Sequence, residues 1–203
     1  GWHLIMNSYA LASTNDPFYL NASRLIVERV LELQDEIEVP LAPHQQTPRR
    51  KGHVGGWMRM MVPGHCVCIP RCRGNANFMV AVALSGMKYY HDVTGDPRVK
   101  KSIIDGALFL AESCYSEKHG YFRYTPCMKM KYKFGVSPLM TEGIARAYLW
   151  TKDARLRHAL QTMIDHPRKE GAYGKPFSMY YRNAPRVMAD IAEAGLTADK
   201  EVK

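Results

Sequence analysis

Acidic residues are missing from two long stretches of this sequence. No Asp or Glu occurs between residues 39 and 91 or between residues 118 and 141. The whole chain has 28 Lys and Arg against 19 Asp and Glu, a net charge of +9. The two acid-free stretches therefore predict a strongly positive surface, which favours acidic partners such as polyanionic sugars or nucleic acid.

Other absences exclude several classes of protein. No apolar run approaches the roughly 20 residues that cross a bilayer, so we expect no membrane partner. There is no glycine-rich phosphate loop and no nucleophile elbow. A glycosidase pair of carboxylates is missing too, because Glu142 is the only obvious acid beside the basic stretches. The chain opens at Gly1 almost inside a predicted helix. We therefore expect a piece of a longer polypeptide, and the N-terminus assigns no compartment.

Cysteine is present in an odd number, five, so the thiols cannot all pair within one chain. His65, Cys66, Cys68 and Cys72 lie within eight residues and are candidate ligands for a structural zinc. Their Cys-x-Cys-x3-Cys spacing differs from the usual Cys-x2-Cys, and a free or partly disulfide-bonded loop is the favoured alternative. Cys114 and Cys127 can join this group only through the fold. The predicted chemistry requires no cofactor.

A Thr-x-Asp turn occurs three times between apolar helical stretches, at residues 14–16, 94–96 and 151–153. Asp is a preferred N-cap, and Pro17 and Pro97 suit the first helical position. The recurrence predicts an internal repeat of antiparallel helix hairpins at about 2–37, 75–116 and 138–165, with the start of a fourth at 178–195. The first helix of each pair is poor in charge and the second is amphipathic, which favours an all-α arc of an α/α toroid. An open α-solenoid is the alternative.

The long connections at 39–74, 117–136 and 166–177 are expected on one end of the molecule, opposite the Thr-x-Asp turns. Loops of this length are usually functional. Phe122 and Tyr124, and then Met128, Met130 and Tyr132, alternate with a period of two and predict a small β-hairpin. We call these connections the loop face and expect it to hold the functional site.

Aromatic, basic and amide side chains in these loops suit β-elimination on a uronate polymer. That reaction needs cations or amides to neutralise the carboxylate, a base to remove a proton, and an acid to protonate the leaving oxygen. Arg73 and Asn77 are predicted for the first task, His65 for the second and Tyr124 for the third. Arg59 and Asn75 are alternatives for the first task, His53 for the second and Tyr121 for the third. The predicted substrate-binding residues are Trp2, His3, His53, Trp57, Arg59, Arg71, Asn75, Tyr121 and Arg123.

The segment from Phe78 to Pro97, a buried helix followed by Thr-Gly-Asp-Pro, resembles the α/α-toroid (six-hairpin) group of carbohydrate-active proteins. This group includes polysaccharide lyases of the heparinase and alginate lyase type. The resemblance is one of fold and assigns no catalytic residue. It implies a periplasmic or secreted enzyme acting on acidic polysaccharide, and a remainder of the toroid, or a partner subunit, that closes the ring.

Two other functions compete with the lyase. One is a glycoside hydrolase that uses Glu142 together with an acid from elsewhere. The other is a non-catalytic helical module that binds polyanions, with nucleic acid as a less favoured ligand. A basic surface without any specific ligand is also compatible with the composition.

Overall fold

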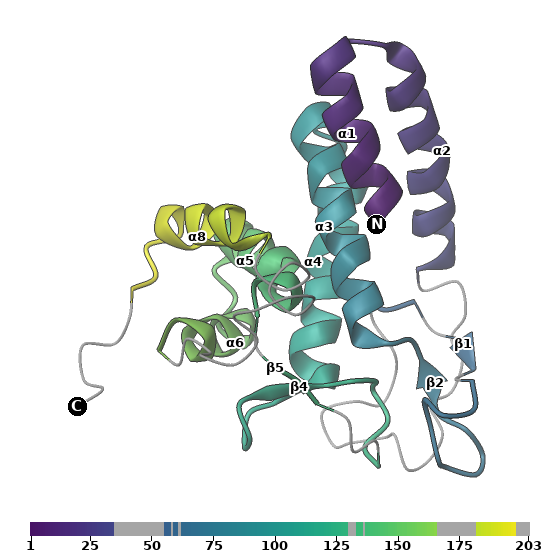
Figure 1. Cartoon of the computed structure of the whole chain (residues 1–203). Helices are drawn as coiled ribbons and strands as arrows, with labels where there is room; N and C mark the ends of the chain where they lie inside the picture. The colour runs from purple at the N-terminus through teal and green to yellow at the C-terminus, as the bar shows by residue number, and fades with distance from the viewer. Residues whose placement is uncertain are drawn as a thin grey trace.

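The computed structural model describes residues 1–34, 55–57, 59–60, 62–129, 133–135, 137–165 and 182–197. Its helices form hairpins (Figure 1): α1 (Trp2–Thr14) with α2 (Pro17–Leu33), α3 (Asn77–Thr94) with α4 (Pro97–Phe109), and α5 (Pro138–Thr151) with α6 (Ala154–Asp165). A further helix, α8 (Ala184–Glu193), packs on α5. The three predicted hairpins are therefore present, and the all-α class is confirmed.

The three Thr-x-Asp turns are built in the same way. In each, the Asp side chain accepts a hydrogen bond from the backbone N–H two residues later, at 2.8–2.9 Å. The Thr hydroxyl accepts from the Asp backbone N–H and donates to the carbonyl four residues earlier. The middle residue, Asn15, Gly95 or Lys152, has a left-handed backbone with φ of 54°, 65° or 55°. At each of the three turns, the same local interactions end one helix and start the next.

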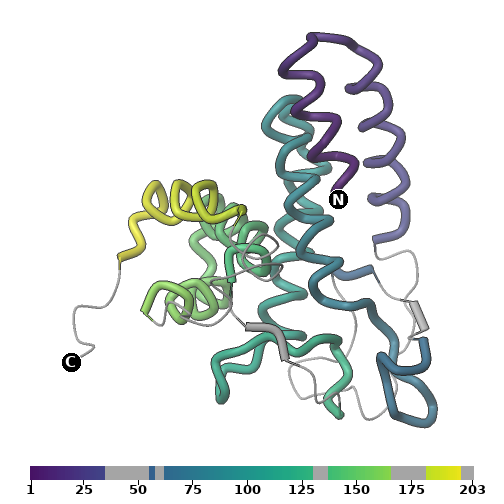
Figure 2. Tube along the Cα trace, in the orientation of Figure 1, coloured from purple at the N-terminus to yellow at the C-terminus, as the bar shows by residue number. Residues whose placement is uncertain are grey.

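Successive first helices contact one another in series, α1 on α3, α3 on α5 and α5 on α8. Each second helix packs on its own first helix, and α4 also contacts α5 (Figure 2). This order agrees with an arc of hairpins, while the toroid itself stays a prediction. No helix of the described residues is long and apolar enough to cross a membrane.

The first helices α3 and α5 are buried as predicted, whereas α1 and α8 are largely exposed. The α3 side chains from Val80 to Tyr90 are mostly buried, and so are those of α5 from Pro138 to Ala145. Helix α1 buries only Leu4 and Ile5. Among the described residues it packs on one hairpin partner and one neighbouring first helix, so one side of it stays exposed.

Short strands lie at the end of the molecule opposite the first two turns (Figure 1). β1 (Arg59–Met60) pairs antiparallel with β2 (Arg73–Gly74), and β4 (Tyr121–Arg123) pairs with both β3 (Tyr115–Ser116) and β5 (Lys133–Gly135). A β-hairpin is therefore present as predicted, with β5 as its second strand, and residues 130–132 of the predicted second strand lie outside the described residues. The prediction of helix to residue 116 was wrong, because a π-helical turn at Leu110–Cys114 ends the helix and leads into β3.

The other predicted boundaries differ only slightly. Helix α2 ends at Leu33, where the sequence predicted a helix to residue 37. Residues 35–37 lie outside the described residues. The fourth first-helix begins at Ala184 where the sequence predicted 178, and residues 178–181 lie outside the described part.

Candidate metal centre

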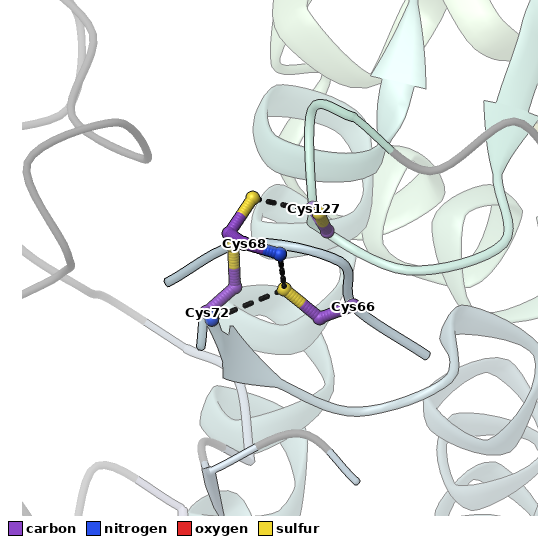
Figure 3. A group of neighbouring side chains, drawn as sticks. All are labelled: Cys66, Cys68, Cys72 and Cys127. Atoms are coloured by element: carbon purple, nitrogen blue, oxygen red, sulfur yellow. Dashed lines mark hydrogen bonds between the residues drawn. The ribbon is translucent and has the colours of Figure 1, made fainter. Parts of the chain in front are cut away.

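Two β-hairpin loops bring four cysteines together. Cys66, Cys68 and Cys72 lie in the connection between β1 and β2, and Cys127 lies in the connection between β4 and β5 (Figure 3). A turn at Pro63–Cys66 begins the first loop, where Gly64 has φ of 84°, a value that favours glycine. The four side chains are between 0 and 6% exposed and form a separate small core.

The four sulfur atoms lie close enough together to share one ion. They all lie within 4.8 Å of one another, and the Sγ atoms of Cys68 and Cys127 are 3.7 Å apart. All five cysteines of the chain are free thiols. Four thiolates at about 2.3 Å from one tetrahedral zinc ion would be separated by about 3.8 Å. The spacing therefore fits a single tetrahedral ion and leaves no room for a larger cluster.

Backbone amides support a thiolate in this group. The backbone N–H groups of Cys68 and Cys72 both donate to the Cys66 Sγ atom at 3.3 Å. Burial raises the pKa of the Cys66 thiol, but these hydrogen bonds lower it, and the result is a pKa of about 7. Burial raises the pKa of Cys68 and of Cys72. The raised pKa values mean that burial disfavours the thiolate form. A bound cation would offset this effect, because metal coordination deprotonates thiols.

Side-chain hydrogen bonds join the two loops next to the sulfur atoms. The buried Thr125 hydroxyl donates to the His65 carbonyl at 3.2 Å and accepts from the Cys127 backbone N–H at 3.3 Å. His65 itself does not belong to the sulfur cluster. Its ring contacts the Tyr124 ring edge to face, with centroids 5.3 Å apart. His65 was a candidate ligand in the sequence, but the group of close ligand atoms contains Cys127 in its place.

Asn77 connects the cluster region to helix α3. Its backbone N–H donates to the Tyr124 carbonyl at 2.8 Å, and its side chain donates to the Arg123 carbonyl at 2.7 Å. Its carbonyl oxygen accepts from the Cys114 thiol at 3.1 Å. Because these contacts occupy the fully buried side chain, Asn77 positions the second loop and is not available to a substrate.

Several predicted site residues do lie together around this region. The half-buried Tyr124 ring also contacts Phe78, and the Arg123 guanidinium donates to the Ser113 carbonyl. The Asn75 side-chain oxygen is buried without a hydrogen-bond partner among the described residues. Arg73 is half-buried in β2. His65, Arg73, Asn77, Arg123 and Tyr124 thus belong to connected segments on the loop face.

Other predicted site residues have different places. Trp57 is structural, because its indole N–H donates to the Val30 carbonyl of α2 at 2.8 Å and its ring lies against Gly106. Tyr121 stacks on His119. Arg71 and His3 are exposed. Arg59 is described only as part of β1, and His53 lies outside the described residues.

The side chains of Glu142 and Lys88 are buried between the helices. The sequence predicted Glu142 as an acid beside the basic stretches, but Glu142 and Lys88 are 0 and 1% exposed. Lys88 Nζ lies 2.7 Å from an Asp190 oxygen and 3.6 Å from Glu142 Oε1. The Asn183 side-chain amide donates to Glu142 Oε2 at 2.6 Å, and Arg146 binds both oxygens of Asp190. This network joins α3 and α5 to the start of α8.

The sequence left Cys127 as a residue that only the fold could add to the cluster, and it did not predict Arg182 or Asn183 at all. Cys127 is 55 positions from Cys72, and only its place in the second acid-free stretch connects it to the first. Arg182 and Asn183 carry no recognisable motif. Trp2 is linked to Glu142 through these two, because Arg182 stacks on Trp2 and its Nε donates to the Asn183 oxygen. The predicted site therefore divides into a loop group and an inner-helix group.

Comparison of the chain with protein-family models, with curated proteins and with solved structures gives no match. The assignment of function therefore rests on the chemistry of this chain's own residues.

Proposed function

We propose that the chain binds one zinc ion at Cys66, Cys68, Cys72 and Cys127. The observation that carries this proposal is the grouping of four buried sulfur atoms within 4.8 Å of one another. Zinc in such a four-thiolate site is structural, because no coordination position is left open for water or substrate. The ion would hold the β1–β2 and β4–β5 loops together.

The metal content of purified chain tests this proposal. We expect about one zinc per chain by elemental analysis, and loss of most of it in Cys127→Ser. Cys114→Ser is the matched control, since Cys114 is equally buried but bonds to Asn77 and lies outside the cluster. A chain that holds visible-absorbing iron, or equal zinc in both variants, would contradict the proposal. Cobalt substitution, with its thiolate charge-transfer bands, checks the ligands independently of folding.

We further propose that the loop face held by this ion binds acidic polysaccharide and cleaves it by β-elimination. The support is the contact of the His65 and Tyr124 rings beside Arg123 within the acid-free stretches. In this reaction a base removes the proton next to the uronate carboxylate, a double bond forms, and the C–O bond to the leaving sugar breaks. The Tyr124 hydroxyl would protonate the leaving oxygen, and His65 would take the first proton.

A lyase, a binding module and a glycoside hydrolase predict different experimental results. A lyase gives new ultraviolet absorbance from the unsaturated product, and Tyr124→Phe removes turnover but keeps salt-sensitive binding. A binding module shows the same binding with no turnover in either protein. Activity on a neutral glycan alone would favour the hydrolase. That alternative has less support, because Lys88 and Asn183 hold the buried Glu142 carboxylate.

A further inference from the structure

Two arginine–aromatic pairs connect the start of α8 to α1 and α3. The Arg182 guanidinium carbon lies 3.6 Å from the Trp2 ring centroid, and that of Arg186 lies 3.6 Å from the Tyr89 ring. The Tyr89 hydroxyl contacts the Tyr9 hydroxyl at 3.1 Å. We propose that this surface is a second binding site, separate from the loop face, for sugars that carry a carboxylate.

The first step of the argument is the availability of the Arg182 charge. Stacking uses the flat face of a guanidinium and leaves its N–H edge free to bind an anion in plane. Arg182 donates its Nε–H to Asn183, and no carboxylate oxygen among the described residues lies within 4.0 Å of it. Burial lowers the pKa of the Arg182 guanidinium, as expected for a partly desolvated cation without an ion-pair partner. A carboxylate would supply that partner.

The second step is the apolar surface beside the charge. Trp2, Met6 and Tyr9 occupy one face of α1 and are 37, 67 and 57% exposed. Seven residues of helix place Trp2 and Tyr9 about 10 Å apart along the axis. Exposed rings in a row suit the C–H faces of sugar rings, and the neighbouring guanidinium group selects those with an acid group.

The third step is that the charged group is held in place. Asn183, only 5% exposed, donates to the Glu142 carboxylate at 2.6 Å and to the Ser85 hydroxyl at 3.3 Å. Arg186 lies 3.7 Å from an Asp92 oxygen, and its Nη1 atom is buried without a hydrogen-bond partner among the described residues. Arg182 therefore extends from a fixed backbone position, which lowers the entropic cost of binding.

Galacturonate added to the intact, zinc-loaded chain tests this site. Nuclear magnetic resonance resolves the indole signals of the three tryptophans, and Trp2→Phe identifies that of Trp2. We expect galacturonate to shift the Trp2 signal and neutral galactose at the same concentration to leave it in place. Arg182→Gln should weaken galacturonate affinity about tenfold. Arg155→Gln is the control, because that exposed arginine is paired with Asp153 and Glu112, and it should change nothing.

Three outcomes would overturn this inference: equal shifts with galactose, unchanged affinity in Arg182→Gln, or equal displacement by an acidic peptide. Its failure is distinguishable from failure of the proposed function. Tyr124→Phe changes the loop face only, so it should remove turnover and keep the Trp2 shift. If the site exists and the loop function does not, the Trp2 shift persists in a chain that shows no turnover.

Discussion

His91 is a half-buried ionisable group near the end of α3. Its ring lies against Trp150, with centroids 4.9 Å apart, and its Nδ1 atom is buried without a hydrogen-bond partner among the described residues. Burial lowers the pKa of His91 below its usual 6.5, although the charge of Asp92 acts in the opposite direction. The folded chain therefore takes up a proton at this site at lower pH than the unfolded chain does.

This difference makes stability depend on pH in a defined direction. As the pH falls through about 6.5, the unfolded state binds the proton first, so the free energy of unfolding should fall until the folded pKa is reached. We expect His91→Phe to lose less stability between pH 7.5 and pH 5.5 than the parent chain, measured as urea midpoints. His119→Gln, a change at an exposed histidine, serves as the control. An identical fall in parent and His91→Phe would contradict this interpretation.

At the scale of elements, the turns between helices carry a repeated ion pair. Arg98 binds its own N-cap Asp96 and also Glu28 of the preceding second helix, with closest distances of 2.8 and 2.7 Å. Arg155 binds Asp153 in the same way and reaches Glu112 at 2.9 Å. Hydrogen bonds from Arg98 lower the pKa of Asp96 and of Glu28. The repeat thus extends from the cap to the contact between neighbouring hairpins.

The three caps provide a matched set of variants. Asp16→Ala and Asp96→Ala should each cost about 1 kcal/mol of stability from loss of the cap. Asp96 also holds Arg98, and Asp16 has no such partner at its turn among the described residues. We therefore expect the loss in Asp96→Ala to shrink more between low and high salt than that in Asp16→Ala. Thermal melts at both salt concentrations measure this, and equal salt dependence would show that the arginine adds nothing.

The buried ionic network holds α8 on α3 and α5. Removing one partner of such a network leaves a charge without compensation, so Lys88→Met should cost about 3–5 kcal/mol. Lys88→Met combined with Glu142→Gln restores the charge balance around Asp190. We expect the double variant to be more stable than Lys88→Met alone, as measured by denaturant unfolding. Additive losses would mean that Glu142 and Lys88 are not coupled.

Local chemistry explains which elements the sequence could predict. The Thr-x-Asp turns rest on contacts within four residues, so their pattern identified all three hairpins. The burial of Lys88 and Glu142 depends on Asp190 and Asn183, which lie in α8 and at its N-cap and have no fixed spacing from them. The fourth cysteine could not be assigned from the sequence for the same reason, and the indole of Trp57, predicted to bind substrate, donates to a backbone carbonyl of α2. The sequence could predict that certain residues lie in the same region. It could not predict which of them form hydrogen bonds or ion pairs with one another.

At the scale of the whole molecule, the local order of one end should depend most on the proposed ion. The cysteines lie among short strands, whereas α3, α4 and α5 are held by the apolar core. We expect a chelator to speed amide hydrogen exchange in the segments 62–74 and 115–127, with little change in α5. Far-ultraviolet circular dichroism should fall only slightly. Loss of protection throughout the helices would show that the ion is needed for the entire fold.

The position of the cysteines along the chain has one more consequence. Cys72 and Cys127 stand immediately before and after the segment that contains α3 and α4, so a shared ion would close that segment into a ring. A cross-link over a loop of this length lowers the entropy of the unfolded chain by an equivalent of about 4 kcal/mol at 25 °C. The central hairpin would then have no free ends from which to fray, and unfolding would begin at the hairpins on either side of it.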